Sequence, residues 1–170
     1  MLIRHLLAIA ALPFTVAVLI PWWIARRYHI TLAMDQSSLQ IAGQCVGSII
    51  VAAGLLLFGT TLWYFAVRGR GTLAPWDPPR ALVVDGPYRY VRNPMISGVL
   101  FILFGEALLL LSWPHAQWAL FFLFVNVVYI PLLEEPILAQ RFGDDYRLYR
   151  QNVWRFIPRP RPWNPNGELR

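Results

Sequence analysis

The chain has 170 residues, of which 57% are hydrophobic and only 14% are charged. A soluble domain usually carries about 25% charged residues, so this composition argues against a soluble globular protein. The apolar residues fall in four long runs, whereas a membrane β-barrel would need short alternating strands. The composition therefore predicts an all-α integral membrane bundle with about four transmembrane helices.

The formal net charge is +6, and all fifteen basic residues are arginine. A basic chain suggests nucleic-acid binding, but these arginines flank the apolar runs and form no groove-binding helix face. Membrane-flanking charge explains them better, so we expect no nucleic-acid partner. The single cysteine, Cys45, lies in an apolar run, and the three histidines lack ligand spacing. We therefore expect no bound metal.

The first apolar run, Leu6 to Ile24, ends in two tryptophans and two arginines without a small-x-small cleavage site. These features predict a retained transmembrane helix rather than a cleaved signal peptide. The second run, about Leu39 to Val67, carries Gly43 and Gly47 in a GxxxG pattern. Such small residues let helices approach closely in lipid, but glycines also occur in membrane helices by chance. Both interpretations stay open from the residues alone.

A polar segment from Arg68 to Pro94 follows, and its five prolines exclude a continuous helix. Within it, the Gly86-Pro87 pair predicts a turn. Asn93 can cap the third helix, with Pro94 at the first helical position. Taken alone, the stretch around these residues fits a helix start with interfacial aromatic residues somewhat better than it fits a binding site.

The third run, Met95 to Trp113, and the fourth, about Ala116 to Leu133, are separated by a very short connection. A connection of that length predicts an antiparallel helical hairpin. Glu106 lies within the third run, and an intramembrane carboxylate is a functional candidate. Its depth separates it from the cytoplasmic segments, so we expect it to form a hydrogen bond within the bundle.

Beyond Leu133 the chain becomes polar, starting with Glu134-Glu135-Pro136. These acids either supply negative charge to the start of a new helix, with Pro136 at its first position, or bind a cationic cofactor or polar ligand group. Four spans would place thirteen of the fifteen arginines on one side, which the positive-inside rule makes cytoplasmic. We therefore expect a bacterial inner (plasma) membrane protein with both termini and the C-terminal tail in the cytoplasm.

Two blocks flank the hairpin: GPYRYVRNPMISG at residues 86–98 and EEPILAQRFGDDYRLYRQNVWRFIPR at residues 134–159. Their order and spacing resemble the isoprenylcysteine carboxyl methyltransferase and phospholipid methyltransferase family over about residues 80–161. We expect one membrane domain over residues 1–170, in which residues 1–67 add two transmembrane helices without a motif. The resemblance implies a methyltransferase that uses S-adenosylmethionine and acts on a lipophilic or membrane-embedded small-molecule acceptor at the cytoplasmic face.

The resemblance also implies site residues in the loop before the third helix and in the acids after the hairpin. The residues implied in cofactor binding are Leu82, Val83, Tyr88, Asn93, Pro94, Glu134 and Glu135. The residues expected in catalysis are Arg92, Glu134 and Arg155. Tyr88 can present an aromatic face to the sulfonium, and the two arginines can hold an anionic acceptor.

The chain departs from the family pattern Arg-His-Pro-x-Tyr, because it reads Arg92-Asn93-Pro94-Met95-Ile96. Asparagine keeps hydrogen-bonding capacity but does not titrate near neutral pH, so a base role for that histidine is absent here. Eukaryotic carboxyl methyltransferases carry a substrate-binding arginine at about the position of Ile130, which argues against prenylcysteine as the acceptor. The alternatives are a catalytically inactive methyltransferase-like interaction protein and, with less support from the apolar spans, a small transporter.

Overall fold

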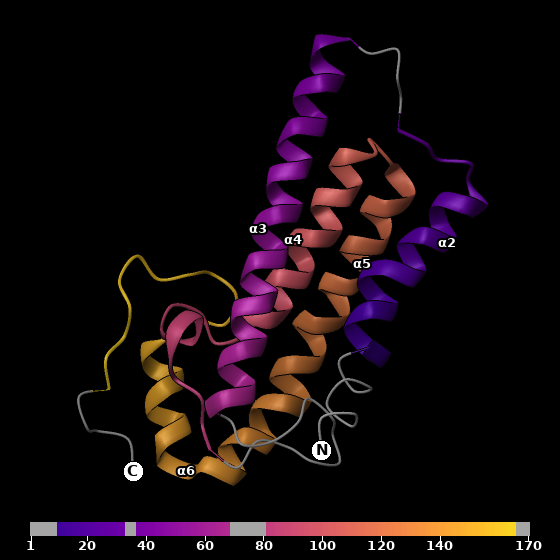
Figure 1. Ribbon diagram of the computed structural model, residues 1–170. Helices are drawn as coiled ribbons and strands as arrows, with labels where there is room; N and C mark the ends of the chain where they lie inside the picture. The colour runs from indigo at the N-terminus through magenta and orange to yellow at the C-terminus, as the bar shows by residue number, and fades with distance from the viewer. Residues whose placement is uncertain (1–9, 33–36, 69–80, 166–170) are drawn as a thin grey trace. The chain divides into compact units, whose positions relative to one another are not determined.

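The computed structural model describes residues 10–32, 37–68 and 81–165, and all regular structure in these ranges is helical (Figure 1). The elements are the π-helix η1 (Ala10–Leu19), α2 (Ile20–Arg27), α3 (Ser38–Arg68), the 3-10 helix η2 (Gly86–Arg89), α4 (Pro94–Leu109), α5 (Trp113–Tyr129), the π-helix η3 (Ile130–Glu134) and α6 (Glu135–Asn152). The predicted start of the first span and the arginines of residues 69–80 lie outside the described residues.

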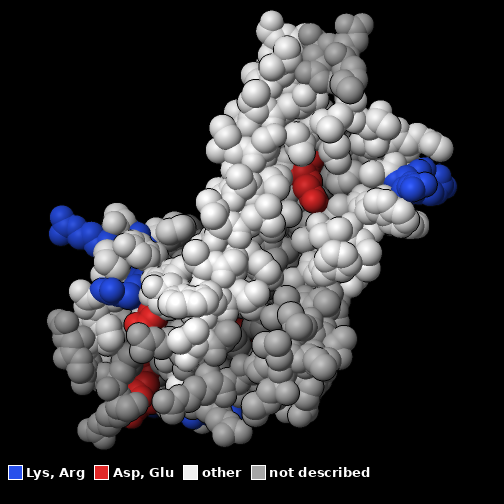
Figure 2. All heavy atoms as spheres, in the orientation of Figure 1, with Lys and Arg blue, Asp and Glu red and all other residues white. Residues whose placement is uncertain are grey.

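Two described helical stretches, Ser38–Tyr64 and Trp113–Asn152, are long and apolar enough to cross a membrane. Only 11% and 17% of their most apolar windows are buried, so the protein itself does not cover them as it would cover the core helix of a soluble domain. Large parts of the described face in Figure 2 accordingly carry no charged side chain. The prediction of an all-α chain with membrane-length helices is confirmed, and the count of four spans stays a prediction.

The last helical stretch continues further than the sequence predicted. Helices α5, η3 and α6 follow one another without a break, whereas we expected a new helix only after Leu133. Pro131 cannot donate a backbone hydrogen bond, and the wider π turn of η3 at this point accommodates that missing donor. Pro136 is the second residue of α6, one position after the predicted first position, and the helix is kinked at Gly143 (φ 54°, ψ −126°).

The chain divides into two compact units. Unit 1 comprises Met1–Leu56 and Gly98–Val125, and unit 2 comprises Leu57–Ser97 and Asn126–Arg170. The boundaries fall within α3, α4 and α5, so each of these helices contributes residues to both units. Every contact described below joins residues of the same unit.

In unit 1, α3 and α4 pack with their backbones in contact. A Cβ atom added at Gly47 would lie 2.5 Å from the backbone nitrogen of Leu109, and one added at Gly54 would lie 2.8 Å from the carbonyl oxygen of Gly98. Any larger residue would force the helices apart, so packing explains both glycines. A Cβ atom added at Gly59, in contrast, would have no other atom within 4 Å, so packing does not explain this glycine.

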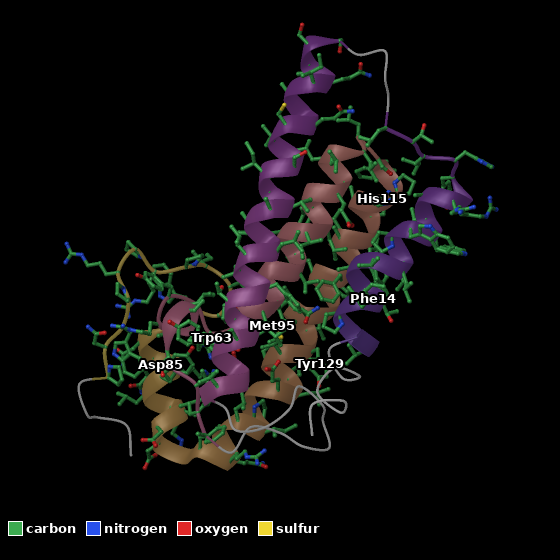
Figure 3. The ribbon with its side chains drawn as sticks, viewed as in Figure 1. Phe14, Trp63, Asp85, Met95, His115 and Tyr129 are labelled. Carbon is green, nitrogen blue, oxygen red and sulfur yellow. The ribbon has the colours of Figure 1, made fainter. Side chains whose placement is uncertain are left out.

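The predicted hairpin is confirmed by the three-residue turn at 110–112 between α4 and α5. His115, at the start of α5 (Figure 3), is only 2% exposed, and its Nε2 atom lies 3.1 Å from the carbonyl oxygen of Pro21. Because a carbonyl only accepts, Nε2 carries the proton, and Nδ1 accepts from the Ser112 hydroxyl at 2.7 Å. His115 thus ties the hairpin turn to α2.

Glu106 does not form the expected hydrogen bond within the bundle. Its Oε2 atom is buried and has no hydrogen-bond partner among the described residues. The buried α4 side chains next to it, including Leu103 and Ala107, are apolar and offer no donor. For Oε2 the prediction was wrong, because the sequence indicates the depth of this carboxylate but not the side chains that face it.

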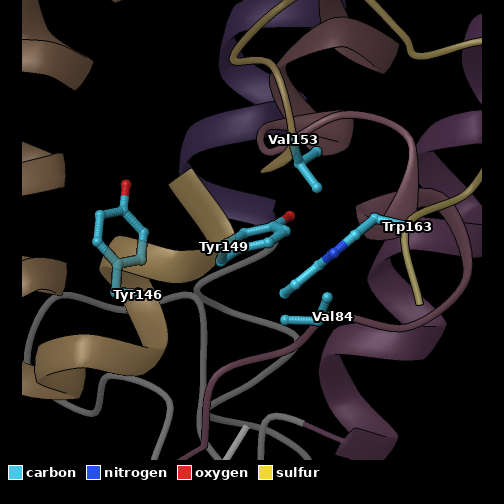
Figure 4. Close-up of a cluster of buried hydrophobic side chains, with 5 residues drawn as sticks. All are labelled: Val84, Tyr146, Tyr149, Val153 and Trp163. Atoms are coloured by element: carbon cyan, nitrogen blue, oxygen red, sulfur yellow. The ribbon is translucent and has the colours of Figure 1, made fainter. Parts of the chain in front are cut away.

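Unit 2 contains a compact core formed by Val84, Tyr146, Tyr149, Val153 and Trp163 (Figure 4). The rings of Tyr149 and Trp163 are stacked, with centroids 5.9 Å apart and planes inclined by 29°. This core joins the loop before α4, helix α6 and the segment after α6. It therefore fixes the three segments that carry the candidate site.

Candidate functional site

A buried ion cluster lies around Glu135, in the first turn of α6. Glu135 is 2% exposed, and its carboxylate accepts hydrogen bonds from Arg155 through Nε at 2.5 Å and Nη2 at 2.9 Å. Arg92 Nη1 lies 2.9 Å from Oε1, and Arg150 Nε lies 3.7 Å from Oε2. Burying a lone carboxylate is costly, and a bidentate guanidinium with further cations offsets that cost.

The cluster also sets the charge state of Glu135, which lies beyond the apolar run that ends at Leu133. Burial opposes ionisation, but the guanidinium groups of Arg155, Arg92 and Arg150 outweigh it and hold the pKa of this carboxyl below its ordinary value. Three guanidinium groups around one carboxylate leave this cluster with a positive net charge. Glu135 is therefore ionised and fully engaged, and the cluster carries more positive than negative charge.

The segment from Val153 to Trp163, called here the C-terminal strap, is bound to the loop before α4. Three backbone hydrogen bonds of 2.9 Å run from Arg92 N to Trp154 O, from Arg159 N to Tyr90 O and from Trp163 N to Arg89 O. The Arg89 side chain adds a fourth bond, because its Nε donates to the carbonyl oxygen of Trp163 at 2.9 Å. The strap therefore holds in place the loop that carries Arg92.

Glu134 differs from its neighbour, because no described residue forms a hydrogen bond or ion pair with its carboxylate. The side chain is partly exposed. Burial, and then the charge of Glu135, raise the pKa of the Glu134 carboxyl. Burial, and then the charge of Glu134, raise the pKa of the Tyr88 phenol above its ordinary value. The Tyr88 phenol is therefore neutral, and the Glu134 carboxyl group has no partner among the described residues that would compete with a ligand.

The backbone of Tyr88 is held by a tight turn. Gly86 has φ 55°, and a Cβ there would collide with the Tyr64 ring, so only glycine fits. The turn begins at Asp85 (Figure 3), whose carbonyl accepts from the Tyr88 N–H at 3.2 Å, and it confirms the predicted Gly-Pro turn. The Tyr149 hydroxyl donates to the Tyr88 carbonyl at 2.7 Å, which fixes the loop against α6.

A family model described as phospholipid methyltransferase matches residues 42–145, more than half of the chain. The chain belongs to the phospholipid methyltransferase family. No curated protein and no solved structure matches the chain. Proteins of this family are S-adenosylmethionine-dependent methyltransferases of lipid-type substrates, so the protein is a methyltransferase that uses this cofactor.

The phospholipid methyltransferase match begins within α3, earlier than the resemblance at about residue 80 suggested. It ends at Asp145, so it includes Arg92, Glu134 and Glu135 but leaves out Arg155 and the C-terminal strap. The matched region therefore contains both acids, whereas Arg150 and Arg155, two of the three arginines around Glu135, lie beyond it.

The unpaired groups of the site fit S-adenosylmethionine, which carries a sulfonium, an ammonium group and a carboxylate. Glu134 offers a free carboxylate to a cationic or hydroxyl group, and the neutral Tyr88 ring offers an aromatic face to a cation. The positive surplus around Glu135 suits a carboxylate or phosphate. The donors and acceptors present thus match the charges of the cofactor.

The structure brings the three predicted residues Arg92, Glu135 and Arg155 together, and it places Glu134 where its charge affects Tyr88.

The remaining predicted contacts are less accessible. Val83 is 7% exposed, Pro94 is fully buried as the first residue of α4, and Leu82 packs against the core of unit 2. The Asn93 carbonyl accepts from the backbone N–H of Ser97. Cofactor contact by these four loop residues stays a prediction.

Sequence reasoning missed four residues that support the site, namely Tyr146, Tyr149, Arg150 and Trp163. Tyr146 accepts a hydrogen bond from Arg92 Nη1 at 3.4 Å through its hydroxyl oxygen. A signal was present in α6, where apolar and aromatic residues recur every three or four positions from Leu138 through Phe142 to Tyr149. That spacing indicates a helix face that packs against the rest of the protein.

Proposed function

We propose that this enzyme transfers a methyl group to a lipophilic or membrane-embedded small-molecule acceptor at the cytoplasmic face of the bacterial inner (plasma) membrane. In this proposal about four transmembrane helices anchor the chain, and both termini lie in the cytoplasm. The distribution of arginines along the sequence supports this orientation. The observation that carries the proposed site is the contrast between Glu135, which three arginines engage, and Glu134, which has no partner among the described residues.

In the proposed site Glu134 and Tyr88 hold the methyl donor. The Glu134 carboxylate accepts hydrogen bonds from cationic or hydroxyl groups, and Tyr88 places its ring against the sulfonium. When bound, S-adenosylmethionine supplies a methyl group that the positive sulfur already activates. Tyr88 is not a base, because burial and the charge of Glu134 keep its phenol protonated. The protein contributes mainly by positioning the two reactants.

We assign Glu135 a positioning role instead of direct cofactor contact. Both of its oxygens are engaged by guanidinium groups, and the residue is 2% exposed. It joins the loop of Arg92, helix α6 and the C-terminal strap, and it thereby orients the adjacent Glu134. The positive surplus of this cluster supports the proposal that Arg92 and Arg155 also attract an anionic group of the acceptor, such as a carboxylate or phosphate.

Calorimetric titration of S-adenosylmethionine into the purified protein, in detergent and in nanodiscs, tests the assignment of Glu134. A charge-assisted hydrogen bond contributes about 1.5–3 kcal/mol, so Glu134→Gln should weaken binding roughly 10- to 150-fold. Asp144→Asn is the matched control, because the Asp144 side chain is 93% exposed on α6, and it should leave binding unchanged. Wild-type affinity in Glu134→Gln would refute the assignment, and no binding to the wild type in either medium would refute the proposed cofactor site.

A labelled methyl donor, incubated with the enzyme and fractionated membrane lipids, identifies the acceptor. Arg92→Ala should reduce methyl transfer to an anionic acceptor. Arg147→Ala is the control, because Arg147 pairs with Asp144 outside the ion cluster and its side chain is 72% exposed. Equal turnover in wild type and Arg92→Ala would contradict a role for Arg92 in holding the acceptor.

A further inference from the structure

The two faces of the C-terminal strap differ sharply in their surroundings. Its inward side chains are engaged: Val153 is fully buried, Arg155 binds Glu135, and Trp163 is 8% exposed in the core. Two large apolar side chains point outward, because Trp154 is 54% exposed and Ile157 is 67% exposed. Two large apolar side chains exposed on one short segment suit contact with a partner surface such as lipid.

The same region is strongly basic. From Arg147 to Trp163 the sequence contains five arginines and no acid. Arg155 is paired with Glu135, and Arg147 is paired with Asp144 at 3.0 Å. Arg161 is exposed near the outward apolar residues in sequence. The exposed side of the strap therefore combines a tryptophan, an isoleucine and positive charge.

We infer that Trp154, Ile157 and Arg161 form a docking surface for the anionic headgroup region of the membrane. Tryptophan prefers the interface between headgroups and hydrocarbon, and each exposed arginine is attracted by anionic lipid. Unit 2 includes the last residues of the apolar helical stretch Ser38–Tyr64, so in this proposal the surface of the membrane lies next to unit 2. A bilayer supplies both an apolar layer and negative charge at that place.

Docking of the strap would connect the lipid surface to the candidate site. The strap holds the loop of Arg92 by backbone hydrogen bonds, and its Arg155 holds Glu135. Lipid bound to the outward face would therefore favour the conformation in which the ion cluster is assembled. This inference does not depend on methyl transfer, since it concerns only where the strap lies.

Environment-sensitive fluorophores attached to single cysteines test the inference on the full chain in nanodiscs, in a Cys45→Ala background. The probe position is Ile157→Cys. Ile49→Cys on α3, where the native side chain is 68% exposed on an apolar stretch, provides the lipid reference. Asp144→Cys provides the aqueous reference, because that side chain is 93% exposed. Lipids with brominated acyl chains quench only labels that contact the bilayer.

A docked strap gives blue-shifted emission and quenching at Ile157→Cys that are close to those of the Ile49→Cys label. Phosphatidylglycerol added to phosphatidylcholine should increase the docked fraction. Arg161→Gln should lower the ratio of docked to undocked strap about fivefold, the effect of one basic residue at an anionic surface. Quenching no stronger than that of the Asp144→Cys label, or a blue shift without lipid quenching, would overturn the inference.

Discussion

Replacing Glu135 by glutamine removes the carboxylate that compensates the cluster of arginines. The side chain of Arg92 is only 8% exposed, so its guanidinium would stay buried without a counter-charge. The side chains of Arg155 and Arg150 are 28% and 57% exposed and can regain water. Removing one partner of a buried ion pair costs about 3–5 kcal/mol. Here Arg92 is the guanidinium that would stay buried without its partner. We therefore expect Glu135→Gln to lower the free energy of unfolding by about 3–5 kcal/mol.

Equilibrium unfolding in mixed micelles with increasing dodecyl sulfate measures this change. The control is Asp144→Asn, which also breaks a carboxylate–arginine pair, at 3.0 Å from Arg147, but with both side chains largely exposed. Solvent-exposed pairs often contribute nothing measurable, so this variant should unfold like the wild type.

A double variant separates loss of the pair from loss of one charge. Arg92→Met with Glu135→Leu removes both buried charges and should be more stable than Glu135→Gln, because no unpaired guanidinium remains buried. If Glu135→Gln were no less stable than Asp144→Asn, the reasoning from the buried cluster would be refuted.

Three further predictions follow from the packing and the charges. Gly47→Ala should destabilise the protein by about 1–3 kcal/mol in the same assay, because its Cβ would meet backbone atoms of α4, whereas Gly59→Ala should not. The pKa of the Glu135 carboxyl is lowered in the folded protein, so its contribution to stability is present above pH 4.5, its ordinary pKa, and should be lost as the pH falls through the lowered pKa. The free energies of unfolding of wild type and Glu135→Gln should therefore differ less in acid than at neutral pH. Tyr149→Phe should cost about 0.5–1.5 kcal/mol, measured as for Gly47→Ala, because the Tyr88 carbonyl loses its donor. Unchanged stability of Gly47→Ala or of Tyr149→Phe would contradict the prediction for that variant. A stability difference between wild type and Glu135→Gln that stays the same in acid would contradict the prediction for the pKa of Glu135.

The long apolar runs were sufficient to predict the helices of this protein. A backbone in lipid has to satisfy its own hydrogen bonds, so a run of membrane length becomes a helix whatever its detailed sequence. The predicted run from Leu39 to Val67 accordingly corresponds to α3 (Ser38–Arg68), and Pro94 begins α4 as predicted. The sequence also contained the motif blocks that pointed to the methyltransferase family, which the match over residues 42–145 confirms.

Only the tertiary structure distinguished Glu134 from Glu135. Successive residues of a helix point about 100° apart, so two adjacent acids cannot share one environment, but their sequence does not say which one faces inward. The ion cluster brings Arg92, from the loop before α4, to Glu135 of α6, together with Arg150 near the end of α6 and Arg155 of the C-terminal strap. Their meeting at one carboxylate depends on how the loop and the strap pack on α6, and local sequence patterns do not encode that packing.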